Sequence, residues 1–177
     1  MPSESSDTVG LVIALLVRFP ELATIVSHHA DGTLTLSFAV AERIDRDAGR
    51  LLREHLADHV RSLVELGGES LDVLGIECES DAGTSFVRIT RDVRTFGREE
   101  LQLLVAVLHD RFGARLHKSP TADDDAFDGD RDDLVDYALE ALRDPTQQRS
   151  LVGFREEKRV LVYFVKSRKK AKARARS

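Results

Sequence analysis

The sequence predicts an α+β protein with a mainly antiparallel sheet of about six strands. Three helix-plus-hairpin units form the sheet, and their helices pack on one face of it. The first observation behind this fold class is that a helical pattern followed by two strand-like segments occurs three times, over residues 8–40, 47–93 and 132–165. The second is that a short polar turn separates the two strand-like segments of each unit, which favours antiparallel pairing. The chain has 177 residues, 42% of them hydrophobic, which is enough for a hydrophobic core.

The first unit is an apolar helix followed by an amphipathic hairpin. Residues 8–18 contain an apolar run that stops just before a proline, which predicts a helix. Segments 23–27 and 34–40 are predicted strands, joined by a tight turn at Asp31-Gly32 in which both residues adopt positive φ. Alternation in the second strand places its apolar side chains on one face and its hydroxyl side chains on the other.

The second unit contains the longest helical pattern of the chain. Residues 47–66 carry an apolar side chain at every third or fourth position, which predicts an amphipathic helix. A hairpin follows over residues 70–79 and 84–93. A further helix is predicted from residue 98 to residue 112, ended by Gly113.

The third unit follows an acidic segment. Residues 117–133 hold seven Asp and little that could be buried, which predicts a loop or linker. A short helix is then predicted over 134–143, and a hairpin over 151–154 and 160–165. The six consecutive apolar residues of the last segment predict a strand covered on both faces.

These elements divide the chain into five parts. They are a flexible leader (1–7), an α+β core (8–116), an acidic loop or linker (117–133), a helix-hairpin unit that docks on the core (134–165) and a basic disordered tail (166–177).

Charge is distributed unevenly between these parts. The net charge of the whole chain is −5, but the tail carries seven basic residues and no acidic one. Without the tail, 19 basic residues stand against 31 acidic ones, a net charge of about −12. Residues 121–133 carry a net charge of −6, so they could pair with the tail and mask it.

The cysteine and histidine content excludes several kinds of site. A single cysteine, Cys78, excludes an intramolecular disulfide, and alternation with Leu74 and Ile76 predicts a buried thiol. His55 and His59 have the i, i+4 spacing of a zinc-binding pair, with Asp58 beside them. The residue after His55 is a leucine, whereas zinc-protease helices need a Glu there. We predict polar residues on a helix flank and no metal site, and a metal-dependent enzyme is the third-ranked hypothesis.

Other motifs of catalysis and cofactor binding are missing from the sequence. It contains no glycine-rich phosphate-binding loop and no nucleophile elbow. In the acidic segment, an alignment that places Gly129 at the invariant glycine of a calcium-binding loop puts Ala126 and Val135 at two ligand positions. We therefore predict no cofactor, no calcium site and no catalytic residue.

The basic tail is the most distinctive feature of the sequence and leads to the predicted function. We predict a non-catalytic cytoplasmic binding or accessory protein whose tail contacts nucleic acid (RNA or DNA) or a ribonucleoprotein such as the ribosome nonspecifically. The tail residues expected to make these contacts are Lys166, Arg168, Lys169, Lys170, Lys172, Arg174 and Arg176. A membrane partner is not expected, because the tail has no large apolar residue to insert. The alternative is a self-associating structural or regulatory protein with an incidental solubilising tail, in which exposed strand edges pair between copies to give a homo-oligomer.

Overall fold

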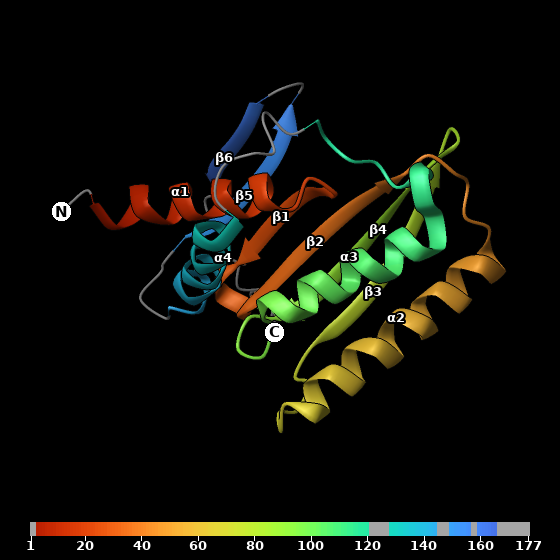
Figure 1. Cartoon of the computed structure of the whole chain (residues 1–177), viewed down its shortest axis with the longest axis horizontal. Helices are drawn as coiled ribbons and strands as arrows, with labels where there is room; N and C mark the ends of the chain where they lie inside the picture. The colour runs from red at the N-terminus through yellow and green to blue at the C-terminus, as the bar shows by residue number, and fades with distance from the viewer. Residues whose placement is uncertain (1–2, 121–127, 145–148, 157–158, 166–177) are drawn as a thin grey trace, which may run out of the picture.

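A computed structural model describes residues 3–120, 128–144, 149–156 and 159–165. It confirms the predicted fold class: within these residues there are four α-helices and one six-stranded antiparallel sheet (Figure 1). Residues 121–127 of the acidic segment and the whole predicted tail lie outside the described residues.

The six strands come from three antiparallel hairpins. In chain order they are β1 (Leu22–His28), β2 (Thr33–Val40), β3 (Leu74–Asp81), β4 (Thr84–Asp92), β5 (Ser150–Glu156) and β6 (Arg159–Val165). Their order across the sheet is β3-β4-β2-β1-β5-β6, and each neighbouring pair is antiparallel. The third hairpin therefore joins the first through the β1–β5 pair, and β3 and β6 are the two edge strands of the described sheet.

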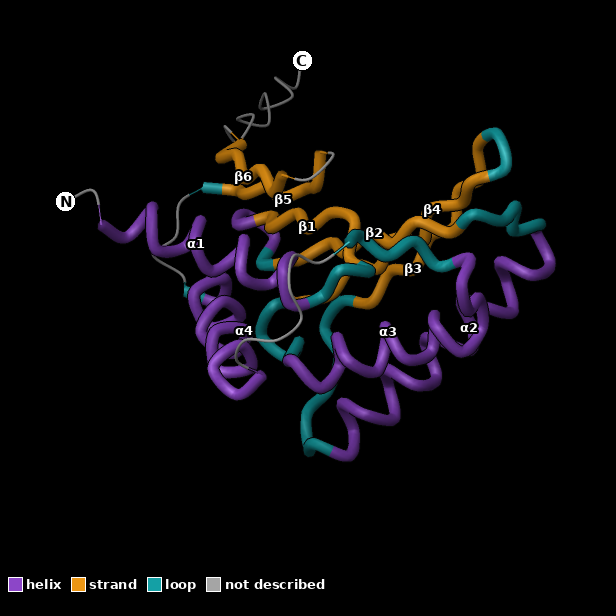
Figure 2. The backbone as a smooth tube through the Cα atoms, turned by 45° about the horizontal axis from the view of Figure 1, so that its top comes forward, coloured by secondary structure: helices purple, strands orange, loops and turns teal. Residues whose placement is uncertain are grey.

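The helices lie together on one face of this sheet (Figure 2). They are α1 (Ser3–Arg18), α2 (Arg46–Leu66), α3 (Arg98–Phe112) and α4 (Asp128–Arg143). Two short 3₁₀ segments, His29–Asp31 and Gly113–Arg115, follow β1 and α3. Because the four described helices form one layer on one face, no helix among the described residues covers the opposite face of the sheet.

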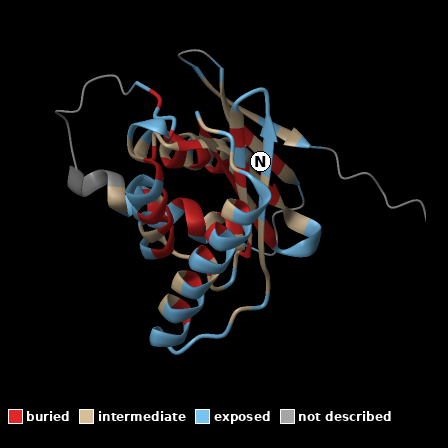
Figure 3. Ribbon diagram, turned by 90° about the vertical axis from the view of Figure 1, so that its right-hand side faces the viewer, coloured by how far each residue is buried: buried red, intermediate tan, exposed pale blue. Residues whose placement is uncertain are grey.

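One hydrophobic core fills the space between the two layers (Figure 3). The sheet contributes alternate side chains such as Leu36 and Phe38, and α1 contributes Leu15 and Leu16. The long helix α2 contributes an apolar side chain at every fourth position from Leu52 to Val64. The predicted alternation of β2 and the predicted apolar stripe of α2 thus face the core.

Two helices begin earlier than predicted. α1 starts at Ser3, inside the predicted flexible leader, and α4 starts at Asp128, inside the predicted acidic linker. Both starts are rich in acidic residues, which favour the positive end of a helix dipole. An acidic polar segment is therefore compatible with a helical first turn as well as with a loop.

The prediction that both residues of the β1–β2 turn, Asp31 and Gly32, adopt positive φ is wrong. The β3–β4 turn has two consecutive residues with positive φ instead. Only Gly32 adopts positive φ (62°) in the β1–β2 connection, because Asp31 belongs to the 3₁₀ segment His29–Asp31 and Gly32 caps that segment. The β3–β4 turn has positive φ at both Ala82 (48°) and Gly83 (85°), as a two-residue hairpin turn requires.

The prediction that the last strand is covered on both faces is also wrong. β6 is an edge strand, and Tyr163 and Val165 are 54% and 41% exposed. An unbroken apolar run indicates two covered faces in a central strand, but the helices that the structure describes cover only one face of this sheet. The apolar side chains on the other face of β6 remain accessible.

Candidate nucleic-acid-binding surface

The face of the sheet opposite the helices, called here the open face, is lined by hydroxyl side chains at its centre. Thr24, Thr35, Ser37 and Thr90 come from β1, β2 and β4, and register places them beside one another. The hydroxyls of Thr35 and Thr90 are 3.0 Å apart, at hydrogen-bond distance. The centre of the open face is therefore polar, and its charged side chain is Arg88 of β4, which is paired with Ser37.

The β5–β6 end of the open face is apolar and aromatic. Register and alternation bring five side chains to this end, called here the aromatic patch: Val152, Phe154, Leu161, Tyr163 and Val165. The rings of Phe154 and Tyr163 are stacked, with their centroids 5.8 Å apart and their planes 27° apart. More than half of the Tyr163 side chain is exposed, so one flat aromatic surface is available to a ligand.

The β3–β4 end of the open face is acidic. Glu77, Glu79 and Asp81 alternate along β3 and are exposed. Arg88 on β4 donates to Glu79 at 2.6 Å. Phe86 is also at this end and is 36% exposed. The two ends of one open face thus differ in both charge and polarity.

The predicted nucleic-acid-binding residues all lie outside the described residues, but the point where the tail begins is known. These residues are Lys166, Arg168, Lys169, Lys170, Lys172, Arg174 and Arg176. They follow Val165, the last residue of β6, which is paired with Ser150 at the end of the aromatic patch.

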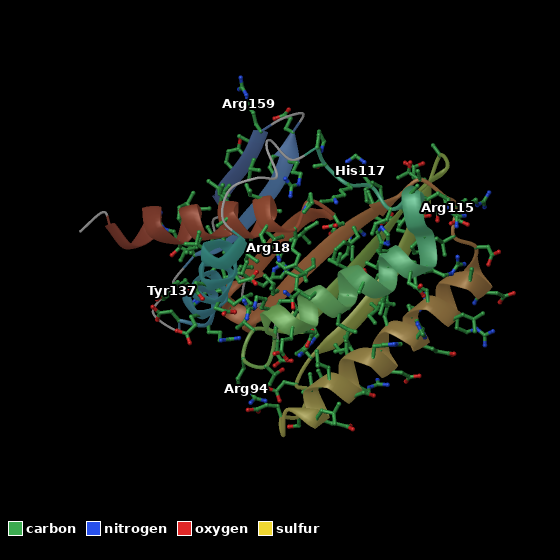
Figure 4. The ribbon with its side chains drawn as sticks, in the orientation of Figure 1. Arg18, Arg94, Arg115, His117, Tyr137 and Arg159 are labelled. Carbon is green, nitrogen blue, oxygen red and sulfur yellow. The ribbon has the colours of Figure 1, made fainter. Side chains whose placement is uncertain are left out.

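Arginine and histidine side chains lie near the residue at which the tail begins, and Arg159 lies at the other end of β6. The Arg149 guanidinium is 5.6 Å from the centroid of the Phe164 ring. The backbone N–H of His29 donates to the hydroxyl of Ser150 at 3.2 Å, which places His28 and His29 beside the start of β5. Arg159 lies at the opposite end of β6 and points away from the sheet (Figure 4).

In the histidine pair of α2, His55 is exposed and His59 is partly buried. The rings of His55 and His59 are 4.3 Å apart, and Nδ1 of His59 is 2.8 Å from the carbonyl oxygen of His55. In the part of the chain that the structure describes, no group of three or more His, Cys, Asp or Glu side chains could hold a metal ion.

A buried charge network at the β4–α3 connection is a feature that sequence reasoning missed. Arg91 is fully buried, and its guanidinium donates to both carboxylate oxygens of Glu100, at 2.7 and 2.9 Å. It also donates to the Asp92 carboxylate, to the Thr95 hydroxyl at 2.9 Å and to the carbonyl oxygen of Val73 at 2.9 Å. All five N–H groups of Arg91 therefore have acceptors within the fold.

The network perturbs the two carboxyl groups in opposite directions. The pKa of Asp92 is lowered to about 2, because hydrogen bonds from Thr95, Val73 and Arg91 outweigh the effect of burial. Burial raises the pKa of Glu100, against the lowering effect of Arg91. A signal in the sequence could have revealed this network: Arg91 is a charged residue at a position where alternation along β4 places a core-facing side chain.

Cys78 is half-buried, and burial raises the pKa of its thiol. It lies at a depression of about 470 Å³ between the β3–β4 turn and the residues before α2. Ser85 and Ser80 hold this region together: the Ser85 hydroxyl donates to the carbonyl oxygen of Glu42 at 2.5 Å and lies 2.7 Å from the Ser80 hydroxyl. The raised pKa disfavours a reactive thiolate at pH 7.

Two other depressions are lined by charged residues that form contacts within the fold. One, of about 460 Å³, lies between α3 and α4 and includes Tyr137 and Arg143; Arg143 donates to the backbone carbonyl of Val93 at 2.9 Å. The other, of about 350 Å³, includes Arg115 and His117, and Arg115 lies 3.0 Å from Glu42 (Figure 4). Because their charged side chains already form contacts within the fold, these depressions are weaker candidates for a ligand-binding site than the aromatic patch.

Comparison with protein-family models, with curated proteins and with solved structures finds no match to this chain. None of the helices in the described residues has both the length and the apolar character needed to cross a membrane.

Proposed function

We propose that this chain is a non-catalytic accessory protein that binds single-stranded nucleic acid without sequence specificity. The basic tail supplies the electrostatic attraction, and the aromatic patch supplies a surface on which bases stack. The observation that carries the proposal is that the stacked Phe154–Tyr163 pair and the start of the basic tail belong to the same hairpin.

Single-stranded nucleic acid suits this combination better than a duplex. Proteins that bind single strands combine positive charge, which follows the phosphate backbone, with aromatic rings that stack on unpaired bases. In a duplex the bases are already stacked on each other and cannot reach Tyr163. Thr24 on β1, which is paired with Phe154, provides a neutral hydrogen-bonding group next to the patch.

The acidic end of the same face limits where a strand can lie. Glu77, Glu79 and Asp81 repel phosphates at the β3 edge, so binding is confined to the β5–β6 side. Tail contacts with phosphate carry no sequence information, and one aromatic pair stacks with any base. We therefore expect low sequence specificity.

The first test is the salt dependence of binding to a fluorescein-labelled oligo(dT) of twenty nucleotides, measured by anisotropy for the full chain and for residues 1–165. If the seven tail cations contact phosphates, the logarithm of the binding constant falls with the logarithm of salt concentration with a slope of about −5. The truncated chain has a net charge of about −12, so we expect it to lose most of both the affinity and the slope.

The aromatic contribution is tested with Tyr163→Ala, with Phe86→Ala at the acidic end as the matched control. Loss of one base-stacking contact costs about 1 kcal/mol or more, so Tyr163→Ala should weaken binding about fivefold at every salt concentration without changing the slope. Phe86→Ala should leave the affinity unchanged. A full chain that binds the oligonucleotide no more tightly than residues 1–165 would contradict the proposal.

A further inference from the structure

The two edges of the sheet are protected to different degrees. An edge strand presents unpaired backbone N–H and C=O groups, and proteins that stay monomeric usually place charges there. β3 meets this condition with Glu77 and Glu79. Between Arg159 and the tail, β6 carries six apolar residues in succession, and no strand among the described residues pairs with its outer edge.

The arrangement of the third hairpin shows what kind of partner would fit this edge. The units α1–β1–β2 and α4–β5–β6 meet through the antiparallel β1–β5 pair and through the contact between α1 and α4. Their strands therefore lie in the order β2-β1-β5-β6, in which β2 and β6 occupy equivalent positions. The outer edge of β2 is covered by the antiparallel strand β4 over eight residue pairs. The equivalent edge of β6 is open to another antiparallel strand.

We infer that a second copy of this chain covers this edge, and that the two β6 strands pair antiparallel about a two-fold axis. A register centred on Val162 pairs all seven residues of β6. It joins Arg159 to Val165, Val160 to Phe164, Leu161 to Tyr163 and Val162 to Val162 of the other copy. Residues of the same parity meet in this register, so core-facing side chains join core-facing side chains and open-face side chains join open-face ones.

The cross-strand pairs of this register are favourable. Phe164 meets Val160 on the helix-covered face, and Tyr163 meets Leu161 on the open face, both of them pairs of an aromatic and an aliphatic side chain. The two basic tails begin at opposite ends of the joint, because the two β6 strands are antiparallel. Six residue steps of about 3.4 Å place the two Val165 residues roughly 20 Å apart.

Pairing along the edge leaves the open face accessible. The two open faces become one surface, with the aromatic patches of both copies adjacent at its centre and a tail at each end of the joint. The inference depends on the unpaired edge and not on the proposed function. If that function also holds, the dimer presents two tails to one nucleic-acid strand.

The test is disulfide cross-linking in full-length protein that carries Cys78→Ser, which removes the only native cysteine. Directly opposite residues in antiparallel strands have Cα atoms about 4.5–5.5 Å apart, within the range that a disulfide spans. Val162→Cys should therefore give covalent dimers on mild oxidation, at least about tenfold faster than Arg159→Cys, whose two copies are too far apart to react directly.

A second arm avoids any change to the half-buried Val162. Arg159→Cys and Val165→Cys, both at exposed positions, should each give no covalent dimer when oxidised alone and should give a disulfide-linked heterodimer when mixed. Sedimentation of the unmodified chain should give twice the monomer mass of 19.7 kDa at micromolar concentration. A monomer mass at all concentrations would overturn the inference. So would a dimer in which the mixed pair links no faster than either variant alone.

Discussion

The two ends of the sheet are attached to the helices in different ways, and they expose different chemistry. At the β3–β4 end, the buried Arg91 joins β4 to α3 through Glu100 and also pairs with its neighbour Asp92. At the β5–β6 end, Gly153 lets α1 approach the sheet so closely that a side chain there would contact Val12 and Leu16. A buried charge network supplements the shared hydrophobic core at one end, and a close approach of α1 to the sheet supplements it at the other.

The same difference continues onto the open face and explains what each end can bind. The β3 edge carries carboxylates, which oppose both an added strand and a phosphate backbone. The β6 edge carries apolar side chains, which permit an added strand. The seven basic residues that follow β6 in the sequence attract a phosphate backbone. The carboxylates of β3 and the residue at which the basic tail begins, Val165 of β6, therefore belong to opposite edge strands of one sheet.

The largest effect is expected from breaking the polar end, with Arg91→Met. The substitution leaves Glu100, of which only 2% of the side chain is exposed, and Asp92 without their buried cation. Removal of one partner of a buried ion pair costs about 3–5 kcal/mol, so we expect a loss of that size in the free energy of unfolding, measured in urea.

Arg94→Met is the matched control for that experiment. Arg94 pairs with Glu69 and Asp72 on the surface at the same end of the sheet (Figure 4). Because exposed ion pairs contribute little to stability, the urea midpoint should not change measurably. Equal losses for Arg91→Met and Arg94→Met would show that the buried network is not what holds this end.

The secondary structure of both ends of the sheet could be predicted from the sequence, but the buried charge network and the exposure of β6 could not. The strands and helices were predictable, because alternation in β2 and the apolar stripe of α2 are local patterns. The network was not, because Glu100 meets Arg91 only when the start of α3 lies against the end of β4. The exposed position of β6 was not predictable either, since an apolar run looks the same in a central strand and an edge strand.

The candidate surface was predictable only in part. The tail cations are visible in the sequence as a charge run, and how they act stays a prediction. The aromatic patch depends on register: Phe154 and Tyr163 are nine residues apart in the chain and stack only because β5 and β6 pair as they do.

The hypothesis that the acidic segment pairs with the tail and masks it is weakened at one residue. Asp132 of that segment already pairs with Arg18 at 3.1 Å and with Arg98 at 3.3 Å.

An effect of intermediate size is expected from pH, because the folded state lowers the pKa of Asp92 from 3.8 to about 2. A lowered carboxyl pKa stabilises the fold above the unfolded value of 3.8, and this stability is lost as pH falls from about 4 to about 2. The shift corresponds to about 2 kcal/mol. The measurement is the difference in unfolding free energy between the natural chain and Asp92→Asn, which should shrink by this amount between pH 5 and pH 2.

The comparison with Asp92→Asn is needed because Glu100 acts in the opposite direction. Its raised pKa adds stability at low pH that is lost as pH rises, so the natural chain alone does not isolate Asp92. Asp72→Asn removes an exposed carboxylate at the same end of the sheet and controls for the change of charge alone. A difference between the natural chain and Asp92→Asn that stays constant from pH 5 to pH 2 would rule out the lowered pKa.

The smallest effect is expected from crowding the apolar end, with Gly153→Ala. A Cβ atom at this position would lie 2.9 Å from Val12 and 3.0 Å from both Ile25 and Leu16, closer than side-chain atoms normally pack. Val12 and Ile25 contribute methyl groups on branched, stiff side chains, and Leu16 contributes the end of a longer one, so relief of the contacts requires a small shift of α1 away from the sheet. We expect a loss of about 1–2 kcal/mol in unfolding free energy, within the range for overpacked cores. Gly75→Ala in β3 is the control, because its Cβ would meet its nearest neighbour, in Thr90, at an ordinary 3.6 Å. Equal stability of the two variants would mean that α1 is free to move away from β5, and that the β5–β6 end is held less tightly than its packing indicates.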